Sequence, residues 1–219
     1  VGSSRVSPET SEALLESIRT RGLWRLSSAA FARRVLGAPA GACARLLSLR
    51  GPTGTVATGA GASLVAVACG AHHLATRSDV EILVAGGFDE RGAAAGSGEG
   101  EGAGCLVLAS GPGSGPAVRL AGWGLAGPGD AAAAMREALA RAGVDAPDLE
   151  LVFGREEIRG LDRARRVDPE AVLGRSDSAG PALGLAAAYA AVRDGAARTA
   201  AVFSSGGSAA CAVLLQRCS

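Results

Sequence analysis

The spacing of apolar residues along the chain predicts alternating helices and strands. After Ser7-Pro8-Glu9, a helix-start signal, apolar side chains follow at helical spacing until Gly22. Short apolar runs bounded by glycine are typical of buried strands, as at Val80 to Ala85 before Gly86-Gly87. The same reasoning predicts helices over Ser63–Ala75, Asp130–Gly143 and Pro181–Val192, and strands over Thr55–Ala57, Cys105–Ala109, Ala117–Ala121, Leu149–Phe153, Thr199–Phe203 and Ala210–Leu215. Pro112, Gly113 and Gly115 predict the turn between the strands at 105–109 and 117–121.

The order helix, strand, double glycine, strand occurs twice. It runs from residue 63 to 109 with Gly86-Gly87, and from 182 to 215 with Gly206-Gly207. Such self-similarity indicates a duplicated α/β unit. We therefore predict two half-domains, 1–128 and 129–219, that form one compact unit with a layered α-β-α-β-α core.

Composition and charge narrow the classes of function. The 219 residues are 48% hydrophobic and 20% charged, enough to bury a sizeable core. The net charge is +1, so no strong field favours nucleic acid or an anionic membrane as a partner. The five cysteines include no Cys-x-x-Cys pair, which predicts reduced thiols and no metal. The chain has no apolar run of about 18 residues that would suggest a membrane span. We therefore expect a cytoplasmic protein without a cofactor.

Four segments carry a resemblance to a known family. They are Leu49 to Ala66 with Thr58-Gly59-Ala60, Ser78 to Gly87 ending in Ala-Gly-Gly, Gly100-Glu101-Gly102-Ala103-Gly104 with its following strand, and Ser204 to Ala210. In this order they resemble the motifs of the β-ketoacyl synthases. The resemblance implies the thiolase-like fold of that family. By this resemblance the chain, which is shorter than a complete ketosynthase, is expected to be truncated within that fold and to lack its opening strand and helix.

The resemblance also implies what the chain has lost. A ketosynthase uses a cysteine thiolate to accept the acyl chain and two histidines to bind the thioester carbonyl and assist decarboxylation. The position of the cysteine holds Ala60, the first histidine motif falls on Phe153 to Glu156 around Gly154, and the second falls on Gly174-Arg175-Ser176. The vestigial positions are therefore Ala60, Gly154 and Arg175, and we expect no catalytic residue.

By this resemblance the chain is a catalytically silent subunit, similar to the chain-length factors of type II polyketide systems. Such subunits pair with an active β-ketoacyl synthase as a heterodimer, complete its interface and shape its acyl tunnel. The family resemblance places the dimer interface at Thr53, Gly54, Thr55, Val56 and Ala57. An acyl carrier protein is a further expected contact, through the mixed-charge segment that includes Arg155 to Arg166.

Two alternative functions stay open. One is an enzyme of changed chemistry on acyl thioesters, a hydrolase or acyltransferase that uses Ser63 or Cys69. The other is a stand-alone homodimeric scaffold.

Other candidate site residues are less favoured. His72 and His73 are adjacent and diverge on a helix, which disfavours a shared ligand. Gly59-x-Gly61 lacks the third glycine of a dinucleotide fingerprint, and we expect Asp177 to pair with Arg175 if that guanidinium enters the old pocket.

Overall fold

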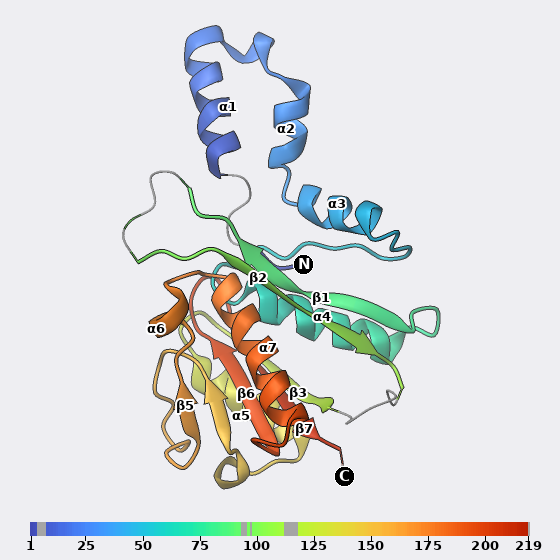
Figure 1. Cartoon of the computed structure of the whole chain (residues 1–219), viewed down its shortest axis with the longest axis vertical. Coiled ribbons are helices and arrows are strands. Elements are labelled where there is room, and N and C mark those ends of the chain that lie inside the picture. Colours follow the sequence, from blue (N-terminus) through green and yellow to red (C-terminus); the bar gives the residue numbers. More distant parts are fainter. Residues whose placement is uncertain (4–7, 93–95, 97, 112–117, 219) are drawn as a thin grey trace.

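The computed structural model describes residues 1–3, 8–92, 96, 98–111 and 118–218. Within them the chain forms two sheets with two helices between them (Figure 1). The intervening helices are α4 (Ala62–Thr76) and α7 (Ala179–Arg193). A further helix, α5 (Ala131–Ala142), packs on the other face of the second sheet. This arrangement is the thiolase-like layering that the sequence predicts.

The second sheet has the strand order β3-β7-β6-β4-β5. Strand β7 runs antiparallel to β3 and β6, whereas β4 runs parallel to both β6 and β5. The bounds are β3 (Val118–Ala126), β4 (Leu151–Phe153), β5 (Arg165–Val167), β6 (Thr199–Ser204) and β7 (Ala210–Arg217). Strand β3 thus pairs with the C-terminal strands although it precedes residue 129. The division of the chain at residue 128 stays a prediction.

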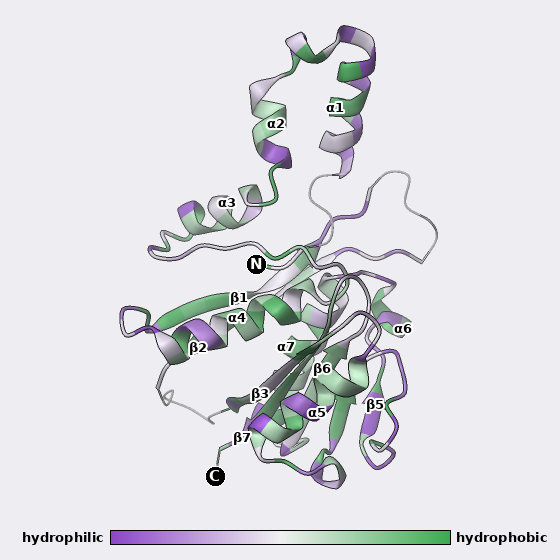
Figure 2. Ribbon diagram, turned by 180° about the vertical axis from the view of Figure 1, so that it is seen from behind, coloured by the Kyte–Doolittle hydropathy of each residue, from purple (hydrophilic) through white to green (hydrophobic). Residues whose placement is uncertain are grey.

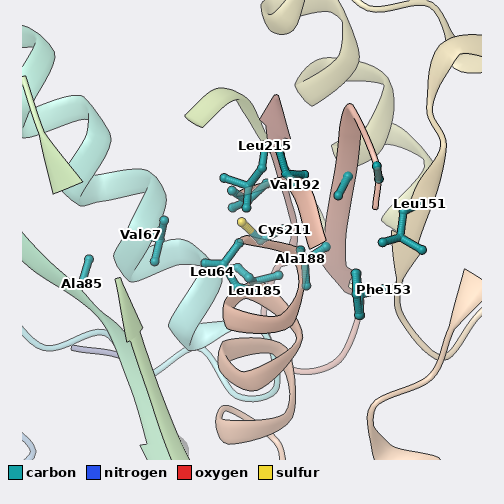
Figure 3. Close-up of a cluster of buried hydrophobic side chains, with 14 of the residues drawn as sticks. Leu64, Val67, Ala85, Leu151, Phe153, Leu185, Ala188, Val192, Cys211 and Leu215 are labelled. Atoms are coloured by element: carbon teal, nitrogen blue, oxygen red, sulfur yellow. The ribbon is translucent and has the colours of Figure 1, made fainter. Parts of the chain in front are cut away.

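The two faces of this sheet are buried against different helices. Alternate residues of β7 point to opposite faces. Cys211, Val213 and Leu215 join the core that α4 and α7 form, and the residues between them join the core under α5. Figure 3 shows the first of these cores, with Leu64 and Leu185 from the two intervening helices beside Cys211.

The first sheet consists of β1 (Ile82–Asp89) and β2 (Gly102–Ala109), paired antiparallel. The prediction that Gly86-Gly87 stops the strand is wrong, because β1 continues through both glycines to Asp89. A Cβ added at Gly87 would lie 2.5 Å from the Cβ of Ser63, and one at Gly86 would lie 2.1 Å from the carbonyl oxygen of Gly104. These glycines therefore serve close packing inside the strand and not a turn.

The predicted strand over Thr55–Ala57 is also wrong. Only Val56 forms an isolated bridge, with Gly2, and Gly2 in turn bridges Gly87 of β1. The amide of Val56 donates to the carbonyl of Val1 at 2.9 Å, and the amide of Ser3 donates to the carbonyl of Val56 at 3.0 Å. The pairing around Val56 is thus limited to isolated bridges and does not form a strand ladder.

The predicted repeat is present as α4-β1-β2 and α7-β6-β7, each with an antiparallel strand pair. The double glycines differ in place, because the first lies inside β1 and the second in the loop before β7. Asp130 caps α5 by accepting from the amide of Ala133 at 2.9 Å, and Gly143 ends it with φ 65°, both as predicted. Ser7, the turn residues Pro112, Gly113 and Gly115, and Ala117 lie outside the described residues.

The sequence between residues 8 and 50 folds into an arm that stands clear of the two sheets (Figure 1). Its elements are α1 (Pro8–Arg21), the 3-10 turn η1 (Leu23–Arg25), α2 (Ser28–Arg34) and α3 (Ala38–Leu46). The short helix α6 (Glu170–Leu173) and the 3-10 turn η2 (Ala146–Asp148) complete the fold. In the described residues, no helix is long and apolar enough to cross a membrane.

Candidate functional site

Ala60 lies in a tight turn that leads from the Val56 edge into α4. Gly59 has φ 87°, and its carbonyl accepts from the amide of Ala62 at 2.9 Å. The turn packs on the loop between β6 and β7, where the amide of Ser208 donates to the carbonyl of Thr58 at 2.8 Å. A Cβ added at Gly207 would lie 2.0 Å from that carbonyl oxygen. Gly206 and Gly207 therefore permit close backbone contact between the loop before β7 and the turn before α4.

The structure brings Ala60, Gly154 and Arg175 together on the wall of one cavity of about 270 Å³. Gly154 follows β4, Arg175 lies in the loop between α6 and α7, and Ala60 precedes α4. The remaining lining residues come from the same loops and strand ends: Gly59, Phe153, Arg155, Glu156, Asp168, Pro169, Glu170, Asp177, Gly180, Pro181, Val202, Phe203, Ser204, Ser205, Gly206 and Gly207. The lining contains neither a cysteine nor a histidine.

The other candidate reactive side chains lie elsewhere. Ser63 is fully buried in α4, and its hydroxyl has no hydrogen-bond partner among the described residues. Cys69 is exposed on α4. Neither lines the cavity. His72 and His73 are exposed, with ring centroids 6.4 Å apart and planes tilted by 50°. Within the described part of the chain, no group of three or more histidine, cysteine or acidic residues has the arrangement of a metal site.

Charged side chains form part of the cavity wall. Its wall holds four carboxylates and two guanidinium groups: Glu156, Asp168, Glu170, Asp177, Arg155 and Arg175. Burial raises the pKa of Glu170, and the carboxylates of Asp168 and Asp177 act in the same direction, while Arg155 and Arg175 oppose it. Ser205 donates a hydrogen bond from its hydroxyl to Glu156. The cavity wall therefore presents charged groups as well as apolar side chains to any molecule that binds there.

The expected ion pair between Arg175 and Asp177 does not form in the described structure. Backbone pairing holds Arg175 instead, since its amide donates to the carbonyl of Gly98 and its carbonyl accepts from the amide of Gly100, both at 2.8 Å. The residue is exposed, so its guanidinium keeps contact with water and needs no buried partner.

Asp89 is a site residue that the sequence reasoning missed. Its side chain is 6% exposed at the end of β1 and accepts hydrogen bonds from the amides of Ser178 and Ala179, the latter at 2.9 Å. These amides lie at the start of α7, so a carboxylate from β1 caps this helix. Its sequence signal is weak: an acidic residue two positions after Gly86-Gly87. The contact fixes the start of α7 beside Asp177 and Gly180 of the cavity wall.

The segment predicted as a dimer interface lies at the edge of the first sheet. Thr53, Gly54 and Ala57 are exposed, while Thr55 and Val56 are partly buried. The amino group of Val1 donates to the carbonyl of Gly54 at 2.9 Å, which ties the segment to the chain start. The segment is thus accessible, and its role at an interface stays a prediction.

No protein-family model and no curated protein matches the chain. Many solved structures match its fold, and three of those that cover nearly the whole sequence are the following. The ishigamide ketosynthase/chain length factor has a TM-score of 0.82 at 23% identity, with coverage of 100% of this chain and 72% of that one. The ketosynthase structure AntDE:AntF, a complex with its type II polyketide synthase acyl carrier protein, has a TM-score of 0.82 at 13% identity and coverage of 100% and 77%.

The third structure is the ketosynthase ApeO in complex with its chain length factor ApeC from Xenorhabdus doucetiae. Its TM-score is 0.77 at 15% identity, and the match covers 99% of this chain and 73% of that one. The chain therefore has the thiolase-like fold of ketosynthases and chain length factors.

Proposed function

We propose that the protein is a catalytically silent ketosynthase-like subunit that pairs with an active β-ketoacyl synthase in polyketide or fatty-acid-type biosynthesis. One observation carries the proposal. The cavity that Ala60, Gly154 and Arg175 line has neither a thiol to form an acyl-enzyme nor an imidazole to stabilise an enolate. A chain with this fold and this cavity is best suited to complete the structure of an active partner.

The similar structures support a partner role. Two of them contain a ketosynthase with a chain length factor, and one is a ketosynthase complex with an acyl carrier protein. For this chain we propose the corresponding partners, an active ketosynthase and, at the assembled surface, an acyl carrier protein in the cytoplasm. The exposed segment of residues 53–57 is the proposed contact with the ketosynthase.

Two measurements test the proposal. Sedimentation velocity of the chain alone and mixed with ketosynthases encoded beside it is expected to show a one-to-one complex only in the mixture. A chain that forms a stable homodimer and ignores every ketosynthase would contradict the pairing.

The second measurement is intact mass after incubation with acyl and malonyl carrier proteins. We expect no covalent adduct on the chain and no decarboxylation of the malonyl group. An acyl adduct on Ser63 or Cys69 would favour the alternative function, a hydrolase or acyltransferase. The structure gives this alternative no support, because both side chains lie outside the cavity.

A further inference from the structure

The cavity beside Ala60 carries charges that the protein itself does not pair. The carboxylates of Glu170 and Asp177 are partly buried, and within the described chain they accept no hydrogen bond and form no ion pair. The guanidinium groups of Arg155 and Arg175 line the same wall, and they form no ion pair with a described carboxylate either. Charges of both signs therefore surround one space without neutralising each other.

The fold holds the carboxylate of Glu170 against the first turn of α7. A Cβ added at Gly180 would lie 3.4 Å from Oε1 of Glu170. The carboxylate of Asp168 has a separate role, because it accepts from the amide of Glu170 at 3.0 Å. Burial raises the pKa of Glu170 even though both cavity arginines act in the opposite direction. The arginines thus do not offset the desolvation of this carboxylate, and a cationic group of a bound molecule would do so.

The buried side chains of the cavity wall are apolar. They are Phe153, Val202 and Phe203, and the strand β6 that contributes the last two is coloured as largely hydrophobic in Figure 2. A Cβ added at Gly154 would lie 2.2 Å from the ring of Phe203, so this ring packs directly on the backbone of the wall. The volume of about 270 Å³ lies just below the range of about 300–1,000 Å³ for pockets that hold drug-sized ligands. The space therefore suits a small molecule with an aliphatic stem and charged ends.

The balance of charge selects the class of molecule. Four carboxylates and two guanidinium groups leave the wall with an excess of two negative charges. A guanidinium group binds a carboxylate through paired hydrogen bonds, and a carboxylate accepts from an ammonium group. A diamine would leave both guanidinium groups without a partner, and a fatty acid would leave the wall carboxylates without a cation.

We propose that the cavity binds a basic α-amino acid. Its carboxylate contacts Arg155 and Arg175, its ammonium groups contact Glu170 and Asp177, and its aliphatic stem lies on Phe203. This inference goes beyond the proposed function and does not depend on it, because all of these residues belong to one chain and the site needs no ketosynthase.

Isothermal titration calorimetry of the full chain tests the class of ligand. The probes are lysine, cadaverine, which lacks the carboxylate, hexanoate, which lacks both ammonium groups, and glutamate, which has a second carboxylate in place of the side-chain ammonium group. We expect one lysine to bind per chain. Each of the other probes is expected to have a Kd at least about tenfold higher, because each loses a hydrogen bond between charged groups.

Variants of the wall test the position of the ligand. Glu170→Gln and Asp177→Asn are expected to raise the Kd for lysine at least about tenfold. Arg175→Gln is expected to do the same for lysine and to leave the Kd for cadaverine within about twofold, since cadaverine has no carboxylate. The matched controls are Glu81→Gln and Arg198→Gln, which change exposed residues that do not line the cavity. Circular dichroism would verify that all variants keep the wild-type fold.

Three results would overturn the inference. In the first, neither lysine nor arginine binds at millimolar concentration. In the second, cadaverine binds as tightly as lysine and Arg175→Gln changes neither affinity, which would make the cavity a site for cations alone. In the third, hexanoate binds most tightly, so that the apolar side chains decide the ligand. None of these results affects sedimentation with a ketosynthase, so the amino-acid site and the proposed function can fail independently.

Discussion

The buried carboxylate of Asp89 offers the sharpest test of how β1 is joined to the start of α7. It accepts from the amides of Ser178 and Ala179 at the start of α7, and its side chain is 6% exposed. Truncation by Asp89→Ala leaves both amides without this acceptor in a place that water cannot readily reach. Hydrogen bonds to a charged group contribute about 1.5–3 kcal/mol each. We therefore expect a loss of about 3 kcal/mol in the free energy of unfolding.

For a chain of this length, 1 kcal/mol shifts the Tm by about 2–4 °C. Asp89→Ala should thus lower the Tm by about 6–12 °C in a thermal melt followed by circular dichroism. Asp89→Asn keeps one acceptor oxygen and should cost less. The matched control is Asp130→Ala, which removes the solvent-exposed cap of α5 and should cost about 1 kcal/mol.

The outcome that would refute this reasoning is specific. If Asp89→Ala destabilises no more than Asp130→Ala, then the carboxylate does not hold the start of α7. The geometry of the cavity wall around Asp177 and Gly180 would then need another explanation.

Three further predictions concern the cavity and the thiols. The variant Ala60→Cys should gain a thiol before α4 that iodoacetamide labels. It should still not decarboxylate malonyl carrier protein, because the cavity lining contains no imidazole. Measurable condensation by this variant would contradict the proposal that the cavity is catalytically silent. Burial raises the pKa of Glu170, so the protonated side chain stabilises the folded state below its ordinary pKa of 4.5. This stabilisation is lost as the pH rises through the pKa of the folded state. Glu170→Gln should therefore be more stable than the wild type at pH 7 and equal to it well below pH 4.5 in urea titrations, with exposed Glu81→Gln as the control. Four cysteines are exposed, whereas burial raises the pKa of Cys211 to about 12, so the folded protein should react with four equivalents of a thiol reagent and a fifth only after denaturation.

Helices such as α5 could be predicted from the sequence because their capping residues and their apolar spacing indicate the same element that packs in the core. The helix between Asp130 and Gly143 has a cap, a stop and an apolar face, and it forms as α5. Helices α2 and α3 were missed, although Ser27 caps α2 and Pro39 lies in the first turn of α3. Their apolar residues do not face a core within the chain, so no clear period marks them.

The strand errors have a different physical cause. A double glycine is a turn signal in isolation, but Gly86-Gly87 allow the backbone of β1 to approach β2 and α4. The edge strand β5 contains Arg165 and Arg166, so its sequence lacks the apolar run of a buried strand. In both cases the neighbouring strand or helix decides the structure, and the local sequence does not.

The cavity was only partly accessible to sequence reasoning. Ala60, Gly154 and Arg175 were identified because each falls within a recognisable motif, and the fold places all three on one wall. Asp168 and Glu170 lie between motifs, where nothing in the sequence marks them as cavity residues. Asp89 contacts the start of a helix that begins 90 residues later, and the pattern of a single sequence does not reveal such distant contacts.

The charges of the cavity also bear on how such a subunit would influence an acyl chain. A long alkyl group bound beside Ala60 would lie in a cavity whose wall also holds carboxylates and guanidinium groups, and any desolvation of these charges would oppose its binding. Most of the exposed large apolar side chains in the described residues lie instead on the arm, next to the proposed partner contact. If the subunit shapes a tunnel, it must therefore do so with residues that it presents to the ketosynthase. Substitutions that alter product length should consequently fall in residues 8–57, and those in the charged cavity should leave it unchanged.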